Sequence, residues 1–543
     1  MIKVFSVAQM VAAEKASDAA GNSYDEMMEK AGRAVAEAII ERRPVSANVV
    51  TILVGPGNNG GDGLVAGRYL AEAGAEVTFY LYRERDPAGD HNLAQVQRMG
   101  LPILLAEHDH RYTVLHSRLQ VSDVVIDALL GTGVSRPIGG ELAKLMSRVQ
   151  RALEEKRGRG KEEKRRGGES VLHSLSGSPA HPLTPPHPYI VAVDCPSGLN
   201  CDTGELDRLA VAAELTVTFA GPKRGHFLFP GAAACGEIVV ADIDISQDLP
   251  EVAAVQTEVV TEERAIGLLP ERRVDGHKGT FGWVLIAAGS ACYWGAAALA
   301  GRAAYRTGAG LVALAVPAAI RPALATQLPE ATYPLIPEQD VLGVEAAEAI
   351  LAELSTYQAL LVGPGLHEAG RFMRALLDGG QETALPPLVV DADGLNLLAA
   401  MTDWPRRLPA NTVLTPHPGE MARLMGAGLD QVRAQDRVDL AREKATEWGC
   451  VILLKGAYTV IAAPDGRCAI LPFANPALAT AGSGDVLSGI IVALLGQGVP
   501  PYEAAVLGGY LHAAAGQRSG LQAGLLAGEI ADWVPEVMDG LWS

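Results

Sequence analysis

The sequence predicts an α/β protein made of two bodies, each built on a largely parallel sheet. Short runs rich in β-branched residues recur along the chain, and each leads through a glycine turn into apolar residues at helical spacing. The 60 glycines and the low share of aromatic residues, 5%, suit many tight strand-to-helix turns. A chain of 543 residues also exceeds what one hydrophobic core normally organises. We expect an N-terminal domain over 1–245, a linker over 246–263 and a C-terminal domain over 264–543.

The composition argues against several classes of binding partner and structural site. A formal net charge of −18 argues against general nucleic-acid binding, because a polyanion would be repelled. The six cysteines are scattered without a Cys-x-x-Cys pair, so neither a zinc site nor a disulfide framework is indicated. The N-terminus lacks a long apolar signal core, and the apolar runs are too short to cross a bilayer. We therefore expect a cytoplasmic protein with no nucleic-acid and no membrane partner.

The first strong pattern in the N-terminal half is a helix that begins near Ser23. Ser23 and Glu26 fit a capping box, and an apolar stripe at helical spacing follows. Residues 48–54 then form a continuous β-branched run, which predicts a buried parallel strand. This strand leads into a glycine-rich loop over 55–63, with a helix through 64–70. Strand, glycine loop and helix together predict a nucleotide-type site.

The glycine loop differs from the common phosphate-binding motifs. It lacks the Lys-Ser/Thr ending of a P-loop. Asn58, Asn59 and Asp62 instead offer amide and carboxylate oxygens beside the loop amides. Such oxygens suit sugar hydroxyls or a hard cation. A polar surface turn without a ligand is the alternative interpretation.

Two further buried strands place polar residues at the same predicted sheet edge. The run 121–127 ends in Asp127 and a glycine turn, and the next strand ends at Asp194, shortly before Ser197. Open α/β sheets bind ligands at the carboxyl ends of their strands. Each of these residues could be a simple capping residue. Their coincidence with Asn59 favours a ligand site.

An unusual segment, 151–188, separates these two strands. Its first part is a dense run of charges and its second part is rich in Ser, Gly, Pro and His. Such a composition cannot bury a core, so we predict a disordered insertion. Its basic residues could contact an acidic partner or the acidic body of the protein itself, and a solvated loop without a role stays open as the alternative.

The C-terminal half repeats the alternation of strands and helices. Buried strand-like runs with polar ends predict a second α/β body; they lie at 283–289, 359–366, 387–395 and 411–420. Residues 451–461 read as two strands that meet, and Pro464 to Gly466 predicts a hairpin turn.

The stretch 479–489 is the motif around which the chain is organised. Small residues and glycines leave backbone N–H groups free at the start of an amphipathic helix that ends near Gly496, which predicts an anion site. Asp485 lies where this helix begins, so its carboxylate can exchange a proton with a group beside the anion. This layout is typical of phosphoryl transfer to a hydroxyl. A glycine-rich turn with an ordinary N-terminal Asp is the alternative.

Three N-terminal segments resemble the NAD(P)H-hydrate epimerases, namely 55–63, 127–133 and 194–198. The resemblance implies a Rossmann-like three-layer sandwich that interconverts the R and S hydrates of NADH and NADPH. It implies that the hydrate is held by Asn58, Asn59, Gly60, Gly61, Asp62, Gly131, Thr132, Gly133, Val134, Ser135, Arg136, Pro137 and Asp194. Asp194 is the candidate catalytic acid or base. The implied potassium ligands, all oxygen donors, are Asn59, Asp127 and Ser197.

Three C-terminal segments, 414–420, 454–459 and 481–487, resemble the ADP- or ATP-dependent NAD(P)H-hydrate dehydratases of the ribokinase-like superfamily. The resemblance implies a ribokinase-like α/β domain that phosphorylates the C6 hydroxyl of the S hydrate and eliminates phosphate. The implied hydrate contacts are Ala296, Gly365, His417 and Asp485, with Asp485 as the candidate catalytic residue. The implied adenine-nucleotide contacts are Lys455, Gly456, Ala457, Tyr458, Thr459 and Gly484. Magnesium is the expected cofactor.

Both motif sets in this order resemble the bifunctional NAD(P)H-hydrate repair enzymes, which implies NADHX and NADPHX as substrates and an adenine nucleotide as phosphoryl donor. ADP is favoured by the resemblance, but the motifs do not exclude ATP. His417 is either a ligand contact or a structural turn residue, and His367 stands where another glycine is expected. A small-molecule kinase, and a non-catalytic N-terminal binding module, are the rival functions. The oligomeric state, a homo-oligomer included, stays open.

Overall fold

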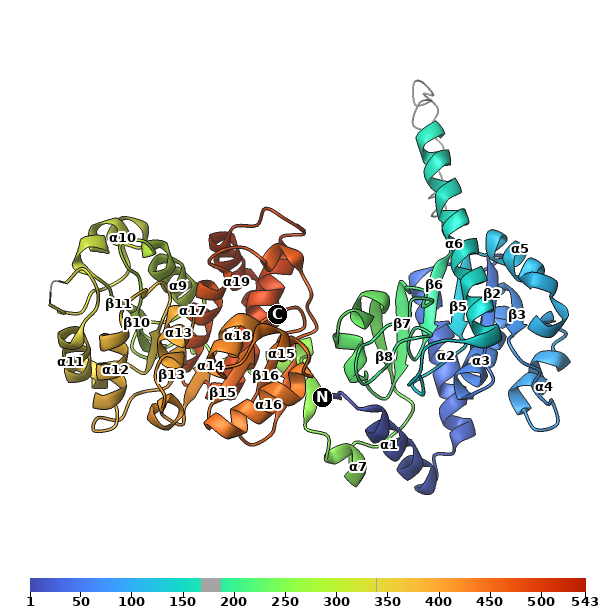
Figure 1. Cartoon of the computed structure of the whole chain (residues 1–543), viewed down its shortest axis with the longest axis horizontal. Helices are drawn as coiled ribbons and strands as arrows, with labels where there is room; N and C mark the ends of the chain where they lie inside the picture. Colours follow the sequence, from blue (N-terminus) through green and yellow to red (C-terminus); the bar gives the residue numbers. More distant parts are fainter. Residues whose placement is uncertain (168–186, 338) are drawn as a thin grey trace. The chain divides into compact units, whose positions relative to one another are not determined.

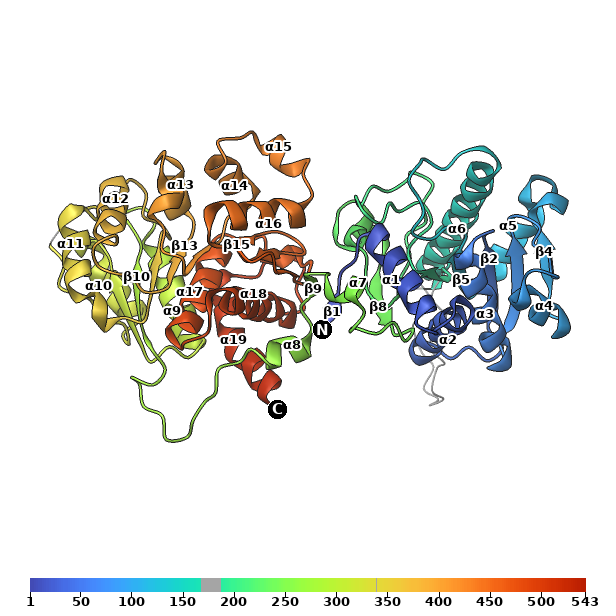
Figure 2. The ribbon, with the colours of Figure 1, turned by 90° about the horizontal axis from the view of Figure 1, so that it is seen from below.

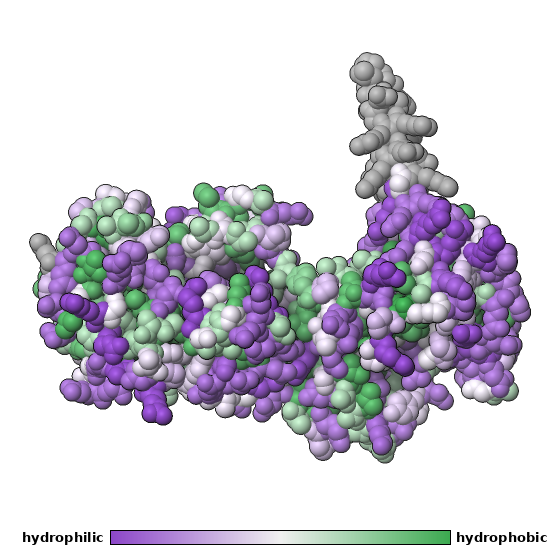
Figure 3. Space-filling model, viewed as in Figure 1, coloured by the Kyte–Doolittle hydropathy of each residue, from purple (hydrophilic) through white to green (hydrophobic). Residues whose placement is uncertain are grey.

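The computed structural model describes residues 1–167, 187–337 and 339–543. The chain divides into two compact units, Ile2–Val255 and Gln256–Ser543, with Met1 assigned to the second. Each unit is α/β, as predicted, with helices on both sides of a mainly parallel sheet (Figure 1). On the face shown in Figure 3, hydrophilic residues are interspersed with hydrophobic ones. Among the described residues, no helix is long and apolar enough to span a bilayer.

The sheet of the N-terminal unit is entirely parallel. Its strands are β2 (Val49–Val54), β3 (Glu76–Leu81), β4 (Ile103–Leu105), β5 (Val124–Ala128), β6 (Tyr189–Val193), β7 (Leu215–Phe219) and β8 (Glu237–Ala241). They lie in the order β4-β3-β2-β5-β6-β7-β8. The chain runs outward from β2 in one direction and returns to β5 on its other side. The chain therefore reverses its direction across the sheet between the neighbouring strands β2 and β5. This is a topological switch point, where open sheets bind ligands.

Helices cover both faces of this sheet (Figure 2). They are α1 (Val7–Ala19), α2 (Tyr24–Arg42), α3 (Asn58–Glu72), α4 (His91–Arg98), α5 (Thr113–Val121), α6 (Gly140–Gly167) and α7 (Pro250–Ala253). Ile52 of β2 belongs to a core with Leu64 of α3, whereas its neighbour Leu53 belongs to a core with Leu145 of α6. Both faces of β2 are therefore buried, which explains the continuous apolar run in its sequence.

Two N-terminal elements allow a direct comparison with the sequence prediction, which is right for the first and partly wrong for the second. The capping box of α2 is confirmed: Glu26 N donates to Ser23 Oγ at 3.3 Å, and Ser23 N donates to Glu26 Oε2 at 2.9 Å. The run 121–127 was placed too early as a strand, because Val121 ends α5 and β5 begins at Val124. β-Branched residues at the end of a short helix and in the next strand are indistinguishable by composition alone.

The glycine-rich loop expected over 55–63 is largely helical, which corrects the prediction that the helix covers 64–70. α3 begins at Asn58. The glycines allow this early start because they permit close packing. A Cβ atom at Gly60 would lie 2.1 Å from the carbonyl oxygen of Gly55, and one at Gly63 would lie 2.6 Å from a side chain of β5.

The disordered insertion expected over 151–188 is wrong for its first part. α6 continues without interruption to Gly167. Ala152 and Leu153 are buried, so the start of the charged run is anchored to the core, and its Glu, Lys and Arg residues are good helix formers. The rest of the predicted insertion, 168–186, lies outside the described residues.

The sheet of the C-terminal unit contains, among the strands described between residues 257 and 470, a single one that runs opposite to its neighbours, and the others are parallel. Its strands are β9 (Thr257–Val259), β10 (Trp283–Ala287), β11 (Leu311–Ala315), β12 (Ala359–Val362), β13 (Leu388–Val390), β14 (Thr412–Leu414), β15 (Val451–Leu454), β16 (Val460–Ala462) and β17 (Cys468–Ile470). They follow the order β9-β17-β16-β15-β14-β13-β12-β10-β11. β16 is antiparallel to both β15 and β17, which confirms the predicted meeting strands and hairpin. The strands from β15 to β11 are parallel.

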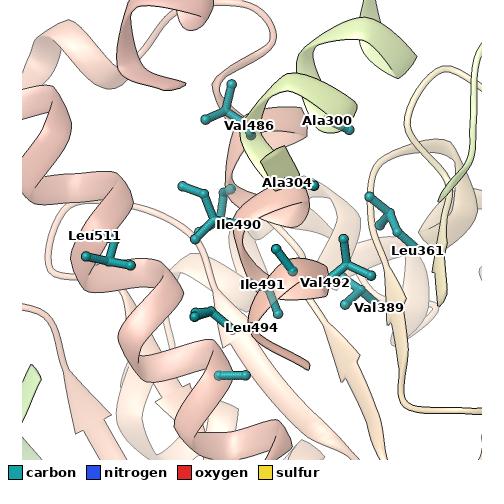
Figure 4. Packing of buried hydrophobic residues seen from close by; sticks show 14 of the residues in the cluster. Ala300, Ala304, Leu361, Val389, Val486, Ile490, Ile491, Val492, Leu494 and Leu511 are labelled. Atoms are coloured by element: carbon teal, nitrogen blue, oxygen red, sulfur yellow. The ribbon is translucent and has the colours of Figure 1, made fainter. Parts of the chain in front are cut away.

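The helices of this unit are α8 (Glu262–Ile266), α9 (Trp294–Arg306), α10 (Arg321–Gln327), α11 (Val344–Glu353), α12 (Gly370–Gly379), α13 (Asp393–Ala399), α14 (Pro418–Leu424), α15 (Leu429–Arg433), α16 (Arg437–Trp448), α17 (Ser483–Gly496), α18 (Pro501–Arg518) and α19 (Ala527–Trp542). α17 is central and ends at Gly496, as predicted. Its Val486, Ile490 and Leu494 are fully buried in a core shared with α9 and α18 (Figure 4). Burial of each such side chain contributes about 1.5–3 kcal/mol, so this core fixes the position of the first turn of α17.

The segment expected as a linker, 246–263, contains regular structure. α7 belongs to the N-terminal unit and β9 belongs to the C-terminal unit, where it pairs with β17. The two units divide between Val255 and Gln256.

Candidate active sites

A cavity of about 650 Å³ lies at the carboxyl edge of the N-terminal sheet, beside the switch point between β2 and β5. It brings together most of the residues predicted to bind the ligand: Asn58, Asn59, Asp62, Gly131, Thr132, Gly133, Val134, Ser135, Arg136, Pro137 and Asp194. Gly60 and Gly61 are not among its lining residues. They lie buried in the first turn of α3, where Gly61 packs against Met28. A concave site with convergent polar groups is the expected form of a small-molecule site.

Asp194 is held in this cavity by a buried cation. Lys223 Nζ lies 2.5 Å from Asp194 Oδ1, and Thr218 Oγ1 donates to the same oxygen at 2.9 Å. Burial by itself would raise the pKa of Asp194, but the charge and hydrogen bond of Lys223 hold that pKa below its usual value. The backbone of Asp194 has a φ of +62°, a strained conformation that is concentrated at functional sites. Asp194 is therefore ionised and its carboxylate is fixed.

The other two carboxyl groups that line the cavity behave in the opposite way. Burial raises the pKa of Asp62 well above its usual value, and the negative charges of Asp194 and Glu14 raise it further. Burial also raises the pKa of Glu14, where the charge of Lys223 opposes the shift and that of Asp194 adds to it. The cavity thus combines one stabilised carboxylate with two groups that retain protons to higher pH.

Sequence reasoning missed two members of this cluster. Lys223 follows β7 in a Gly-Pro turn, so it is a fourth polar residue at the same strand edge, and that position could have indicated it. Glu14 comes from α1, a helix that no strand pattern precedes. Nothing local distinguishes Glu14 from other acidic residues on a helix surface.

The three predicted potassium ligands also lie close together. Ser197 Oγ donates to Asp127 Oδ1 at 2.6 Å, and Ser197 N donates to Asp127 Oδ2 at 2.8 Å. Asn59 Nδ2 donates to Leu130 O at 2.9 Å, which fixes the orientation of the amide. Asn59 Oδ1 is buried and accepts no hydrogen bond from the described part of the chain. A buried amide oxygen without a donor, beside a carboxylate and a hydroxyl, fits a hard monovalent cation.

In the C-terminal unit, Lys455 is paired with a carboxylate that had not been predicted as a site residue. Lys455 Nζ donates to Asp391 Oδ1 at 2.8 Å, and Thr415 Oγ1 donates to the same oxygen at 2.7 Å. Asp391 Oδ2 is buried, and within the described ranges it has no hydrogen-bond partner. A Cβ atom at Gly484 would lie 3.6 Å from this oxygen and 3.4 Å from Lys455 Nζ. The pair therefore faces the first turn of α17.

Asp485 lies in that first turn, as predicted. Burial raises its pKa to about 7, and the negative charge of Asp391 adds to the shift while Lys455 opposes it. Asp393 and Glu420 contribute further negative charge. A carboxylate that titrates near neutral pH is well matched to accept a proton from a hydroxyl.

Two predicted hydrate contacts of the C-terminal unit are neighbours. Gly365 has a φ of +65°, and a Cβ atom there would lie 2.7 Å from Tyr293 O and 3.1 Å from Ala296 Cβ. Only glycine allows this close approach. His367, where a glycine was expected, also has positive φ, and its N–H donates to Asp393 Oδ2 at 2.9 Å. This hydrogen bond stabilises the backbone of His367, so a residue other than the expected glycine is tolerated at this position.

His417 acts as the N-cap of α14. Its Nδ1 accepts from Gly419 N at 2.9 Å, and Glu420 Oε2 accepts from His417 N at 2.7 Å. Burial lowers the pKa of His417, and the charges of Lys455 and Arg423 lower it further. His417 thus has a structural role at the start of α14. Its ring is half-exposed and remains available for a ligand.

A partly buried arginine, Arg437, fixes the predicted nucleotide loop. Arg437 donates to Leu454 O at 2.9 Å and to Ala457 O at 2.5 Å, and burial lowers its pKa to about 10. Within the loop, Thr459 Oγ1 donates to Gly456 O at 2.8 Å. Arg437 was missed because its role appears only when α16 packs beside this loop.

Comparison with known proteins decides the family. A family model described as NAD(P)H-hydrate dehydratase matches residues 284–535, and one described as YjeF-related protein N-terminus matches residues 24–225. The bifunctional NAD(P)H-hydrate repair enzyme of Moorella thermoacetica is 40% identical over 95% of this chain and 92% of its own. The chain belongs to the bifunctional NAD(P)H-hydrate repair enzyme family. Membership confirms the family resemblance inferred from the motifs.

Two further repair enzymes are similar over most of the chain, and one solved structure is similar over about half of it. The repair enzyme of Thermofilum pendens is 36% identical over 97% of this chain and 94% of its own. That of Escherichia coli is 32% identical over 92% and 86%, respectively. The ADP/ATP-dependent NAD(P)H-hydrate dehydratase of Bacillus subtilis, crystallised with ATP and magnesium, is 33% identical over 52% of this chain and 98% of its own, with a TM-score of 0.43.

Proposed function

We propose that the chain restores NADH and NADPH from their hydrates. The N-terminal unit interconverts the R and S epimers, and the C-terminal unit dehydrates the S form at the expense of an adenine nucleotide. The observation that carries the proposal is the position of Asp485, a carboxyl group with a pKa of about 7 in the first turn of α17, next to the Lys455–Asp391 pair. The family names and the separate cavity around Asp194 support the pairing of two activities.

The dehydratase chemistry follows from the leaving group. Hydroxide leaves poorly, so the C6 hydroxyl must first be phosphorylated. Asp485 takes the hydroxyl proton while the backbone N–H groups at the start of α17 stabilise charge on the transferring phosphoryl group. Phosphate then leaves with the C6–O bond electrons, the C5 proton passes to the departing phosphate, and the C5–C6 double bond is restored. The products are NAD(P)H, phosphate, the nucleotide shortened by one phosphate, and the hydroxyl proton, which Asp485 releases to solvent.

The nucleotide and its cation have candidate ligands in the C-terminal unit. We assign the adenine nucleotide to Lys455, Gly456, Ala457, Tyr458, Thr459 and Gly484. The unpartnered Asp391 Oδ2 and the carboxyl group of Glu420, whose pKa is raised by burial, would hold magnesium beside the phosphates. The ion would neutralise charge on the phosphoryl group. ADP is the proposed donor and ATP the alternative.

The epimerase site uses Asp194 as its base and potassium as its cation. Asn59, Asp127 and Ser197 would hold the ion, which would supply fixed positive charge at the wall of the cavity. We place the reaction in the cytoplasm, because all six cysteines are free thiols and both substrates derive from soluble cofactors. Association into a homo-oligomer is a further proposal, to be tested by light scattering.

The proposed dehydratase is tested with purified S hydrate, magnesium and either ADP or ATP. We expect dihydronicotinamide absorbance and free phosphate to rise in equal amounts, faster with the true donor. A stable phosphorylated product without phosphate release would favour the small-molecule kinase instead. For the epimerase, full activity of an Asp194→Ala variant would contradict the role of Asp194 as the base.

A further inference from the structure

Glu14 is a cavity residue with no assigned role. It lines the same cavity as Asp62 and Asp194 but comes from α1, which precedes the residues matched by the N-terminal family model. A carboxyl group that is mostly withdrawn from water and open to a ligand cavity is costly to keep unless it serves the site.

The N-terminal segment is fixed to the loop that carries Lys223. Phe5 N donates to Pro222 O at 3.0 Å, and Arg224 N donates to Phe5 O at 3.1 Å, so these bonds flank Lys223 on both sides. At the start of α1, Val7 N donates to a carboxylate of the loop after β6 at 2.8 Å. α1 therefore presents Glu14 at a fixed position relative to the ion pair.

The charges around Glu14 separate its protonation state from that of Asp194. Burial is the largest influence on Glu14 and raises its pKa. Asp194 has the opposite shift, because Lys223 offsets its burial. Two carboxyl groups in one cavity whose pKa values are driven apart form an acid and base pair.

We propose that Glu14 is the proton donor of the epimerase reaction and that Asp194 is its base. This inference rests on the proposed epimerase function of the same cavity. In the hydrate, C6 carries the hydroxyl group and is bonded to the ring nitrogen N1. Asp194 takes the hydroxyl proton, the C6–O bond becomes a carbonyl, and the C6–N1 bond breaks. Its electron pair goes to N1, which takes the proton from Glu14.

Closure of the ring completes the reaction without net change in atoms or charge. Rotation about the C5–C6 bond turns the other face of the aldehyde to N1. N1 attacks C6 and returns its proton to Glu14, while the carbonyl oxygen takes back the proton from Asp194. The hydroxyl group is then on the opposite face of the ring. Each carboxyl group ends in its starting state, ready for the next turnover.

The test uses the full chain without nucleotide, so that the dehydratase is idle. Purified S hydrate is converted and the ratio of R to S is followed by chromatography, with spontaneous epimerisation subtracted. Glu14→Gln keeps the size of the side chain but removes the acid, and we expect its rate to fall by about 10²- to 10⁴-fold. Glu14→Asp keeps the acid and is expected to recover part of the rate.

The pH profile separates a proton donor from a structural role. The wild-type rate should fall as pH rises through the pKa of Glu14, since the donor is then lost. The ionisable groups that act on Glu14 or respond to it are Lys223, Asp194, Asp62 and Tyr24. Glu14→Asp should keep this alkaline decrease, and Glu14→Gln should lose it.

Controls keep the outcomes distinct. Asp18→Asn, an exposed position on α1, should leave the epimerase unchanged, and every variant should keep its nucleotide-dependent dehydratase activity. A Glu14→Gln variant with the wild-type rate and profile would overturn the proposal. So would an alkaline decrease that persists in Glu14→Gln but disappears in Asp62→Asn, because the donor would then be Asp62. A wild-type chain without epimerase activity would instead overturn the proposed function.

Discussion

Lys223 and Asp194 form an ion pair, with 2.5 Å between Nζ and Oδ1, and Asp194 lines the N-terminal cavity. The Lys223 side chain is only 1% exposed. The pair fixes the base of the proposed epimerase and keeps it ionised. It also joins β6 to the loop after β7, so it has consequences for stability as well as for activity.

Lys223→Met should therefore lower both epimerase activity and stability. Loss of one partner leaves a buried charge, which costs about 3–5 kcal/mol. In the wild type the lowered pKa of Asp194 stabilises the fold at neutral pH, and this contribution is lost as pH falls below the ordinary pKa. Without Lys223, burial would raise that pKa, and acid should then stabilise the variant. Urea unfolding at several pH values measures this, with Lys223→Arg as the charge-preserving control. Equal pH dependence of both variants would contradict the account.

The dehydratase should respond to pH through Asp485. A base works only when ionised, so the rate should rise as pH increases through about 7, the pKa to which burial raises this group. Turnover of S hydrate with saturating nucleotide measures the profile. Asp485→Asn should reduce the rate by about 10²-fold or more and remove the dependence, while epimerase activity serves as its internal control. A pH-independent wild-type rate would contradict the role of Asp485 as base.

Potassium should stabilise the N-terminal unit through Asn59. The unpartnered Asn59 Oδ1 gives the ion a buried ligand. Because the ion binds only the folded state, Tm should rise by roughly 2–4 °C for each kcal/mol by which binding stabilises that state. Asn59→Ala should lose this potassium-dependent rise. Asn58→Ala, at an exposed neighbouring position, should keep it. Melting curves in potassium and in lithium chloride at equal ionic strength make the comparison, and identical curves for the wild type would rule out the site.

Arg437 should matter for the nucleotide rather than for the hydrate. It donates to the carbonyl groups of Leu454, Lys455 and Ala457, which hold the predicted nucleotide loop. Arg437→Met should raise the KM for nucleotide by roughly tenfold, equivalent to about 1.4 kcal/mol, with little change in the KM for hydrate. Arg433→Met, at an exposed position on α15, is the matched control. An equal rise in both KM values would point to general loosening of the unit.

Local patterns in the sequence predicted the elements whose signals are local. The Ser23 capping box, the β16 hairpin and the start and end of α17 each depend on a few adjacent residues. The helical start of α3 was missed because its glycines, read as a loop, serve instead for close packing. Packing of Ala152 and Leu153 likewise overrode a composition typical of disorder.

The residues of the candidate sites also differ in whether the sequence alone could predict them. Asn59, Asp127 and Asp194 lie at or just beyond the carboxyl ends of neighbouring parallel strands, so their convergence could be predicted from the strand pattern. Lys223 and Glu14 complete the cluster through contacts between segments far apart in the chain, and Asp391 gains its importance only through Lys455 and α17. Burial and pairing of charges, which set the pKa values, are properties of the assembled fold.

The most direct test of the central claim uses a mixture of R and S NADH hydrates with magnesium, potassium and ADP or ATP. We predict complete return of dihydronicotinamide absorbance from both epimers, dependent on nucleotide and faster than spontaneous epimerisation. Recovery of only the S fraction, followed by a slow phase, would show a dehydratase beside an inactive N-terminal unit. No recovery with either nucleotide would contradict the repair function.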